Sequence, residues 1–205
     1  MSDLDKLIAE FEKFPGVGAR QARRFAFHIL TLNKIDSSEL ARLISELKAT
    51  VTECQSCRRF FSTTNAQTLC SICDASNRDH SRLMVVERDT DIQAVERAGV
   101  YDGLYFVLGG SVPLLNNNDN NKLRGGALKA TAEVRLKENN LKEVILGFAI
   151  NPDGENTARF VESILAPLFV GTECTISHLG RGLSTGSELE YADAETIKSA
   201  LRNRA

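Results

Sequence analysis

The sequence predicts a multidomain α/β protein with a small helical unit, a metal-binding cysteine segment, an α/β domain and a C-terminal helical tail. Three observations predict this arrangement. Apolar residues recur at helical spacing through the first 50 residues. Two Cys-x2-Cys pairs then stand in a polar segment with little periodicity. From Arg82 onward, short apolar runs alternate with helical stretches, which is typical of a mostly parallel sheet covered on both faces.

The N-terminal part contains three expected helices. The first covers residues 3–12, and the sequence Phe14-Pro15-Gly16-Val17-Gly18 ends it. The second covers residues 19–32, with His28 expected to be packed among its apolar neighbours. Asp36, followed three residues later by Glu39, resembles a capping box and predicts the start of the third helix.

The composition favours a folded protein. Apolar residues make up 42% of the 205 residues, enough for a packed core. No run approaches the roughly 20 apolar residues that span a bilayer. The acidic N-terminus lacks the basic region of a signal peptide, so we expect a cytoplasmic protein.

Charge is distributed unevenly along the chain. The net charge is −2, yet the stretch from Lys13 to Ile35 has five basic residues and no acidic ones, so the remainder carries −7 (5 − 7 = −2). This polarity suits a protein that binds nucleic acid with its N-terminal part. The five basic residues are Lys13, Arg20, Arg23, Arg24 and Lys34.

Four of the five cysteines form the pattern Cys54-x2-Cys57-x12-Cys70-x2-Cys73. Each pair can turn both thiolates toward one ion, and two pairs complete a tetrahedral zinc site. Because all four positions are filled by protein, we expect one structural zinc per chain and no metal catalysis there. The alternative is four buried or redox-active thiols.

The segment Phe14–Gly18 looks like the turn of a helix-hairpin-helix motif. Its glycines permit a tight turn, and the amides at the start of the next helix can bind a DNA phosphate. Arg20 and Arg24 share one helical face and Arg23 lies close to it. The alternative is an ordinary turn between helices with a solvated basic face.

Acidic residues follow the first strand of the α/β region, which is expected at Leu83–Val86. Glu87, Asp89 and Asp91 resemble the first half of a Toprim domain, in which such acids can hold Mg²⁺. The second half is expected at Asn151–Glu155, after a strand at Val144–Leu146 and before a helix from Thr157. Three uses stay open: catalysis, partner binding, or simple stabilisation of helix N-termini.

Taken together, these motifs resemble the RecR family of bacterial recombination mediators along nearly the whole chain. The match includes Arg24-Phe-Ala-Phe-His28, the four cysteines, Val85-Val-Glu87, Tyr101-Asp-Gly-Leu-Tyr-Phe-Val-Leu-Gly-Gly110 and Leu189-Glu-Tyr-Ala-Asp193. An Asn-rich loop at residues 116–121 departs from the family pattern. The acidic segment around Asp153 and Glu155 is two residues shorter than usual.

The resemblance implies a non-enzymatic DNA-binding protein that forms a ring, typically a tetramer. It implies binding to RecO, in many bacteria to RecF, and loading of RecA onto single-stranded DNA. By position, Arg20, Arg24, Arg23 and Lys13 are the expected DNA contacts. Glu155, Asp153 and Tyr191 are the expected partner contacts. The expected parts are residues 1–52 (helix-hairpin-helix), 53–79 (zinc finger), 80–178 (Toprim) and 179–205 (oligomer contacts).

Two other functions remain to be separated from this one. A Toprim nuclease, primase or topoisomerase requires catalytic acids, and a topoisomerase also requires a nucleophilic tyrosine from a further domain. A zinc-ribbon protein that binds only other proteins lacks salt-sensitive DNA binding.

Overall fold

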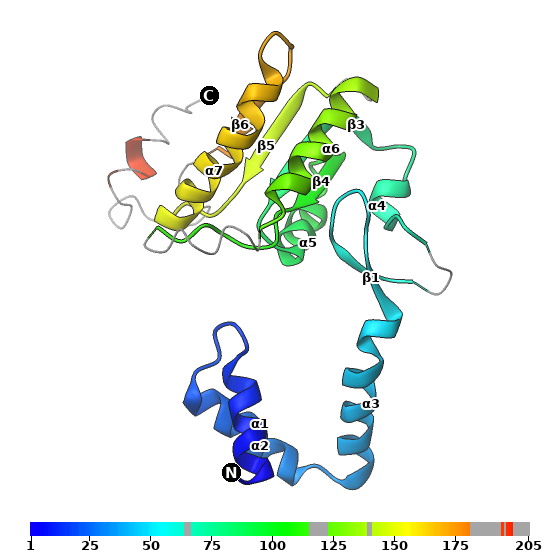
Figure 1. Cartoon of the computed structure of the whole chain (residues 1–205), viewed down its shortest axis with the longest axis vertical. Coiled ribbons are helices and arrows are strands. Elements are labelled where there is room, and N and C mark those ends of the chain that lie inside the picture. The colour runs from blue at the N-terminus through cyan, green and yellow to red at the C-terminus, as the bar shows by residue number, and fades with distance from the viewer. Residues whose placement is uncertain (64–66, 115–122, 139–140, 181–193, 195, 199–205) are drawn as a thin grey trace. The chain divides into compact units, whose positions relative to one another are not determined.

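The computed structural model describes residues 1–63, 67–114, 123–138, 141–180, 194 and 196–198 (Figure 1). The chain divides into two compact units, Met1–Val51 and Thr52–Ala205. The predicted loop at residues 116–121, Tyr191 and most of the predicted C-terminal helix lie outside the described residues.

The first unit contains helices α1 (Asp3–Glu12), α2 (Ala19–Thr31) and α3 (Lys34–Thr50). Ser2 caps α1, since its hydroxyl accepts from the Asp5 amide and the Asp5 carboxylate accepts from the Ser2 amide. α1 and α2 pack against each other, and the ring of Phe11 meets that of Phe25 edge-on at 6.0 Å. α2 buries only Ala22 and Ala26, whose small side chains allow close approach. The predicted helix–turn–helix pair is confirmed.

Two predictions for this unit are wrong. α3 begins at Lys34 because Asn33 is its N-cap, and the Asn33 side chain accepts from the Asp36 amide at 2.9 Å. Asp36 therefore lies inside the first turn and does not cap the helix. His28 is exposed, since α2 turns its alanine face toward the packed side.

The cysteine segment folds around a two-stranded sheet of β1 (Val51–Glu53) and β2 (Phe60–Ser62), followed by the short helix α4 (Ser71–Asp74). Hydrogen bonds from its backbone join it to the α/β domain. The Cys57 carbonyl accepts from the Val107 amide at 2.8 Å, and the Phe60 amide donates to the Asp89 carboxylate at 2.7 Å.

The α/β domain has a four-stranded sheet in the order β4-β3-β5-β6, and every described pair is parallel. This confirms the predicted mostly parallel sheet. Its strands are β3 (Asp79–Val86), β4 (Gly103–Val107), β5 (Glu143–Gly147) and β6 (Thr175–His178), and its helices are α5 (Asp89–Ala98), α6 (Gly125–Glu138) and α7 (Pro152–Phe169).

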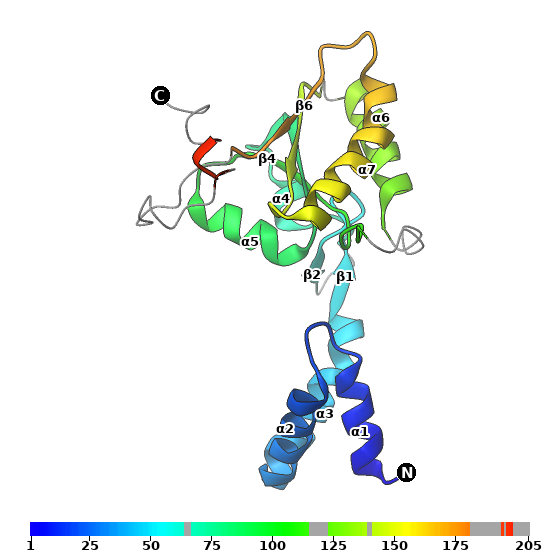
Figure 2. The same cartoon turned by 90° about the vertical axis from the view of Figure 1, so that its left-hand side faces the viewer.

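The helices cover both faces of this sheet. α5 lies on one face, and α6 with α7 on the other (Figure 2). Connections between parallel strands are right-handed, so the direction in which the chain crosses the sheet decides which face its helix covers. The chain crosses from β3 to β4 in one direction along the sheet and from β4 through β5 to β6 in the opposite direction, which places the helices on opposite faces. β4 lies at the edge of the sheet, yet it is buried along its whole length because the cysteine segment covers that edge.

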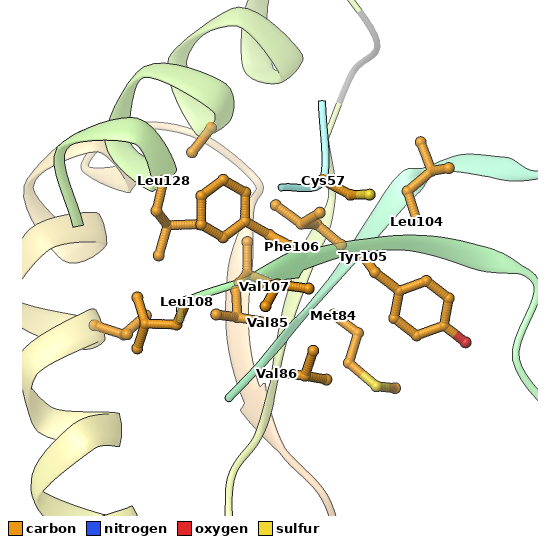
Figure 3. Packing of buried hydrophobic residues seen from close by; sticks show 14 of the residues in the cluster. Cys57, Met84, Val85, Val86, Leu104, Tyr105, Phe106, Val107, Leu108 and Leu128 are labelled. Carbon is orange, nitrogen blue, oxygen red and sulfur yellow. The ribbon is translucent and has the colours of Figure 1, made fainter. Parts of the chain in front are cut away.

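The core lies between the sheet and the helices on both of its faces, and the cysteine segment contributes to it. Figure 3 shows the ring of Phe106 directed toward Leu128 of α6, while Tyr105 points to the opposite face of β4. Three of the four paired cysteines belong to this same buried cluster. The cysteine segment is therefore part of the core of the second unit.

Candidate functional site

The four cysteine sulfurs form one cluster, as the spacing predicts. All four Sγ atoms lie within 4.8 Å of one another, and those of Cys57 and Cys70 are 3.6 Å apart. In a tetrahedral site with zinc–sulfur bonds of about 2.3 Å, neighbouring sulfurs are about 3.8 Å apart. The donor set therefore fits a four-coordinate thiophilic metal such as zinc.

Local backbone geometry turns the first pair of sulfurs inward. The Arg58 amide donates to the Cys54 carbonyl at 2.9 Å, and the Cys54 amide donates to the Arg59 carbonyl at 2.8 Å. Arg58 has a φ of 65°, a left-handed conformation that occurs at no other described non-glycine residue. Cys70 is the N-cap of α4, and its amide donates to the Cys54 sulfur at 3.4 Å.

Burial and the short distances between the sulfurs disfavour four free thiols in this cluster. Hydrogen bonds from Cys57 and the other thiols lower the pKa of Cys54. Donating to Cys54 raises the pKa of both Cys57 and Cys73. Four thiolates cannot share this volume without a cation to offset their charge, and a coordinated metal deprotonates its thiols outright. Because protein fills all four positions, such a metal is structural.

The start of α2 is open to an anion. Gly18 is its N-cap and offers no side-chain capping bond, and the first turn of the helix has no acidic residue. Gly16 has a φ of +75°, and a Cβ atom added there would have no heavy atom within 4 Å. The turn therefore requires glycine because of its left-handed backbone conformation and not because of a lack of space. Free amide groups and the helix dipole at this end favour a phosphate.

Basic side chains flank that helix start. Arg20, Arg23 and Arg24 are all exposed, and Arg24 donates to Gln21 at 3.4 Å. Lys13 is exposed as well, but its ammonium group forms an ion pair with Glu10 at 2.6 Å. The predicted arginines thus lie in the first two turns of α2, whereas the charge of Lys13 is already partly offset.

The acids after β3 have structural partners. Asp89 accepts from the Phe60 amide, Asp91 accepts from the Arg88 amide at 2.8 Å at the start of α5, and Glu87 pairs with Arg88 at 2.8 Å. The four cysteines are the one group of metal-ligating side chains found among the described residues. Glu87, Asp89 and Asp91 do not converge into a second such group.

α7 begins at Pro152, five residues before the predicted start at Thr157, because Asn151 caps it and accepts from the Gly154 amide at 2.8 Å. A side chain at Gly154 would meet the Ala149 carbonyl oxygen at 1.9 Å, so this start requires glycine. Asp153 and Glu155 both fall in the first turn.

These two acids differ in their surroundings. Asp153 accepts from the Leu114 amide at 2.9 Å, which holds the segment after β4 against α7. Glu155 borders a cavity of about 410 Å³ and lies 3.9 Å from Arg159. The same cavity is bordered by His178, which bonds Glu162 at 2.9 Å.

Two buried polar residues were missed from the sequence, one in α7 and one in α6. Thr157 is fully buried, and its hydroxyl accepts from the Val112 amide at 2.8 Å while it donates to the Asp153 carbonyl at 2.6 Å. Arg135 is buried in α6 and donates to Ser56 at 2.9 Å. A polar residue on an otherwise apolar helix face was the available signal in both helices.

The fold and the cysteine site define a Toprim-domain protein with a helix-hairpin-helix unit and a four-cysteine cluster suited to zinc. The family description "RecR, helix-hairpin-helix" matches residues 4–48, "Toprim domain" matches residues 81–179, and "RecR, C-terminal" matches residues 182–205.

Relatives named "Recombination protein RecR" match along nearly their full length. The one from Staphylococcus saprophyticus is 35% identical, covering 98% of this chain and 96% of its own. That from Desulforudis audaxviator is 36% identical (97% and 94%), and that from Chloroflexus aggregans is 39% identical (97% and 91%). The chain belongs to the RecR family of recombination proteins. Within the described residues, no helix is both long and apolar enough to cross a membrane.

Proposed function

We propose that this protein is a DNA-binding recombination mediator that acts without catalysis in DNA repair. The observation that carries the proposal is the start of α2, which has no side-chain cap and no acidic residue, flanked by exposed Arg20, Arg23 and Arg24. Contacts of amides and arginines go to phosphates, so binding is expected on all sequences alike. A role on chromosomal DNA implies a cytoplasmic, nucleoid-associated protein.

The metal of the four-cysteine site is proposed to be zinc, one per chain. The four buried or half-buried thiols and the 3.6 Å separation of Cys57 and Cys70 support it. When bound, zinc would cross-link the turn at Cys54–Cys57 to the turn at Cys70–Cys73. The hydrogen bond from the Val107 amide to the Cys57 carbonyl holds the cysteine segment against the edge of β4.

Several copies of the chain are proposed to act on one DNA as a ring, with a tetramer as the expected form. A single hairpin offers few cations, and a symmetric assembly repeats them around an opening. Exposed apolar side chains along α3 support this, because a second copy of the chain can cover them. They are Leu40, Leu43, Ile44 and Leu47.

The solution mass of the protein, measured by light scattering with and without DNA at micromolar concentration, tests the oligomer. We expect a mass of several chains that Leu43→Asp reduces, while Ser45→Asp on the same helix leaves it unchanged. A protein that stays monomeric with DNA present contradicts the ring.

The partners are proposed to be RecO and, in some settings, RecF, with loading of RecA onto single-stranded DNA as the outcome. Glu155 is the leading contact for RecO, since it borders the cavity beside Arg159 and His178. Asp153 is a weaker candidate because its carboxylate already holds Leu114. Tyr191 lies outside the described residues, and its role rests on family position alone.

Glu155→Ala is expected to weaken RecO binding and to leave DNA binding nearly intact. Isothermal titration calorimetry against RecO measures the first, and Glu138→Ala, an exposed acid of α6, is the matched control. Equal affinities for wild type and Glu155→Ala remove this residue from the interface.

A nuclease or topoisomerase is the competing assignment. The partners of Asp89 and Asp91 argue against it, since both carboxylates are committed to backbone amides. A nicking assay with Mg²⁺ decides between the two, and metal-dependent cleavage of DNA by the purified protein overturns the non-catalytic assignment.

A further inference from the structure

Arg135 occupies a position where an apolar side chain is expected. It lies in the last turn of α6, on the face that also buries Leu128 and Ala132, and it is 5% exposed. A buried guanidinium stays charged, and burying it without a partner costs far more than burying a neutral polar group. Something nearby must therefore offset its charge.

Hydrogen bonds within the chain account for only part of this offset. Its Nη2 donates to the Ser56 hydroxyl at 2.9 Å, a neutral acceptor. Its Nε and Nη1 are buried and have no hydrogen-bond partner. Within the part of the chain that the structure describes, no carboxylate forms an ion pair with it.

The cysteine cluster is the group that can supply negative charge to Arg135. Ser56 stands in the turn between Cys54 and Cys57, so the hydrogen bond to Ser56 anchors the guanidinium to the turn that carries two of the four sulfurs. Burial lowers the pKa of Arg135, and attraction to the thiolates of Cys73, Cys57 and Cys54 opposes that change. Four thiolates around one Zn²⁺ carry a formal charge of −2 (2 − 4 = −2).

We propose that Arg135 is the counter-charge of the four-cysteine metal centre and couples metal binding to α6 of the α/β domain. The proposal rests on the zinc assignment above. Each charge makes burial of the other favourable: the guanidinium offsets part of the −2 charge, and the metal centre supplies the anion that Arg135 lacks elsewhere. Groups outside the ligand set that orient or compensate a metal centre typically change metal affinity by about 10–100-fold.

This role predicts opposite effects of one substitution in the two metal states. Arg135→Met keeps the aliphatic volume and removes the charge. In zinc-loaded protein it should lower zinc affinity by about tenfold or more and lower the thermal midpoint. In metal-free protein it should leave the midpoint unchanged or raise it, because an uncompensated buried charge is gone. A residue that serves only packing would lower both midpoints.

The experiment uses the full-length protein. Zinc content is measured first by elemental analysis, then zinc affinity by competition with a chromophoric chelator, then thermal unfolding with and without metal. Arg135→Lys, which keeps the charge, should retain most of the affinity. Ser56→Ala should have a small effect because it removes only the neutral hydrogen bond. Lys137→Met removes an exposed charge from the same turn of α6 and is the matched control.

The outcomes separate this inference from the zinc assignment. Wild-type protein without zinc overturns the zinc assignment and, with it, the role of Arg135. Zinc-containing wild type with unchanged affinity in Arg135→Met overturns the counter-charge role alone. If Arg135→Met does not fold, the comparison of Arg135→Lys with Arg135→Gln decides: equal zinc affinities of those two overturn the proposal, and a loss in the glutamine variant alone supports it.

Discussion

Cys57→Ser is expected to release the metal and to destabilise the whole second unit. Serine does not ionise at neutral pH, so the site keeps three thiolates and loses its closed tetrahedral set. The substitution keeps the backbone, so the Cys57 carbonyl can still accept from the Val107 amide and only the thiolate is lost.

The magnitude follows from what the cysteine segment buries. Cys54, Cys57 and Cys70 are at most 1% exposed, and Ile72 is 8% exposed. Burial of such side chains contributes about 1–2 kcal/mol each, so loss of this packing costs about 4–8 kcal/mol. That is on the order of half the unfolding free energy of an ordinary domain, about 5–15 kcal/mol.

Elemental analysis and thermal unfolding followed by circular dichroism measure the two effects. We expect about one zinc per wild-type chain and almost none in Cys57→Ser, whose midpoint should match that of wild type stripped by a chelator. Cys174→Ser is the control for zinc content, because Cys174 is a buried cysteine that is not one of the four clustered cysteines. Reduced wild-type protein without zinc, or Cys57→Ser with wild-type zinc content and midpoint, refutes the structural role of the metal.

Two further substitutions test the α/β domain. Asp153→Ala should destabilise the protein by about 0.5–1.5 kcal/mol in denaturant unfolding because the Leu114 amide loses its carboxylate acceptor and turns to water. Asp153→Asn, which keeps an acceptor, should cost less, and equal costs contradict the assigned bond. The Asp79 carboxylate accepts hydrogen bonds from the Ser81 hydroxyl and from Arg82. These bonds, that of Ser81 most of all, lower the pKa of Asp79 to about 2. Since the folded pKa lies below the unfolded value, this stabilisation is present above about pH 4 and is lost as pH falls toward 2. Asp79→Asn should therefore flatten the loss of thermal midpoint between pH 4 and pH 2, and an unchanged slope refutes the link.

The sequence predicted the order of elements and the clustering of the four cysteines well, because both depend on local spacing. Two Cys-x2-Cys pairs in a polar segment leave few arrangements other than one shared ion. Alternating apolar runs likewise predict strands such as Leu83–Val86 inside β3. Glycines at residues 16 and 18 predicted the turn between α1 and α2.

Helix starts were predicted less well where a cap competes with propensity. Asn33 precedes the predicted cap Asp36, and Asn151 with Pro152 starts α7 before the expected Thr157. In both cases an asparagine side chain accepts from the amide three residues later, a local bond that apolar periodicity does not record.

The roles of the acids depended on tertiary contacts that spacing cannot show. Asp89 and Asp153 looked like ligands or partner contacts, yet each accepts from an amide at least 29 residues away in sequence. The burial of Arg135 was overlooked for the same reason, since its hydrogen-bond partner Ser56 lies 79 residues away in the cysteine segment.

The salt dependence of DNA binding tests the central claim most directly. Each neutralised phosphate adds about 0.7–0.9 to the slope of log affinity against log salt. Arg20→Ala combined with Arg24→Ala should therefore lower the slope by about 1.4–1.8 for each hairpin that contacts the DNA. The control pair is Arg97→Ala with Arg159→Ala, which removes two exposed arginines of the second unit. We predict a steep wild-type slope that the first pair flattens and the control pair leaves unchanged. A first-pair variant with the wild-type slope contradicts DNA binding by the hairpin.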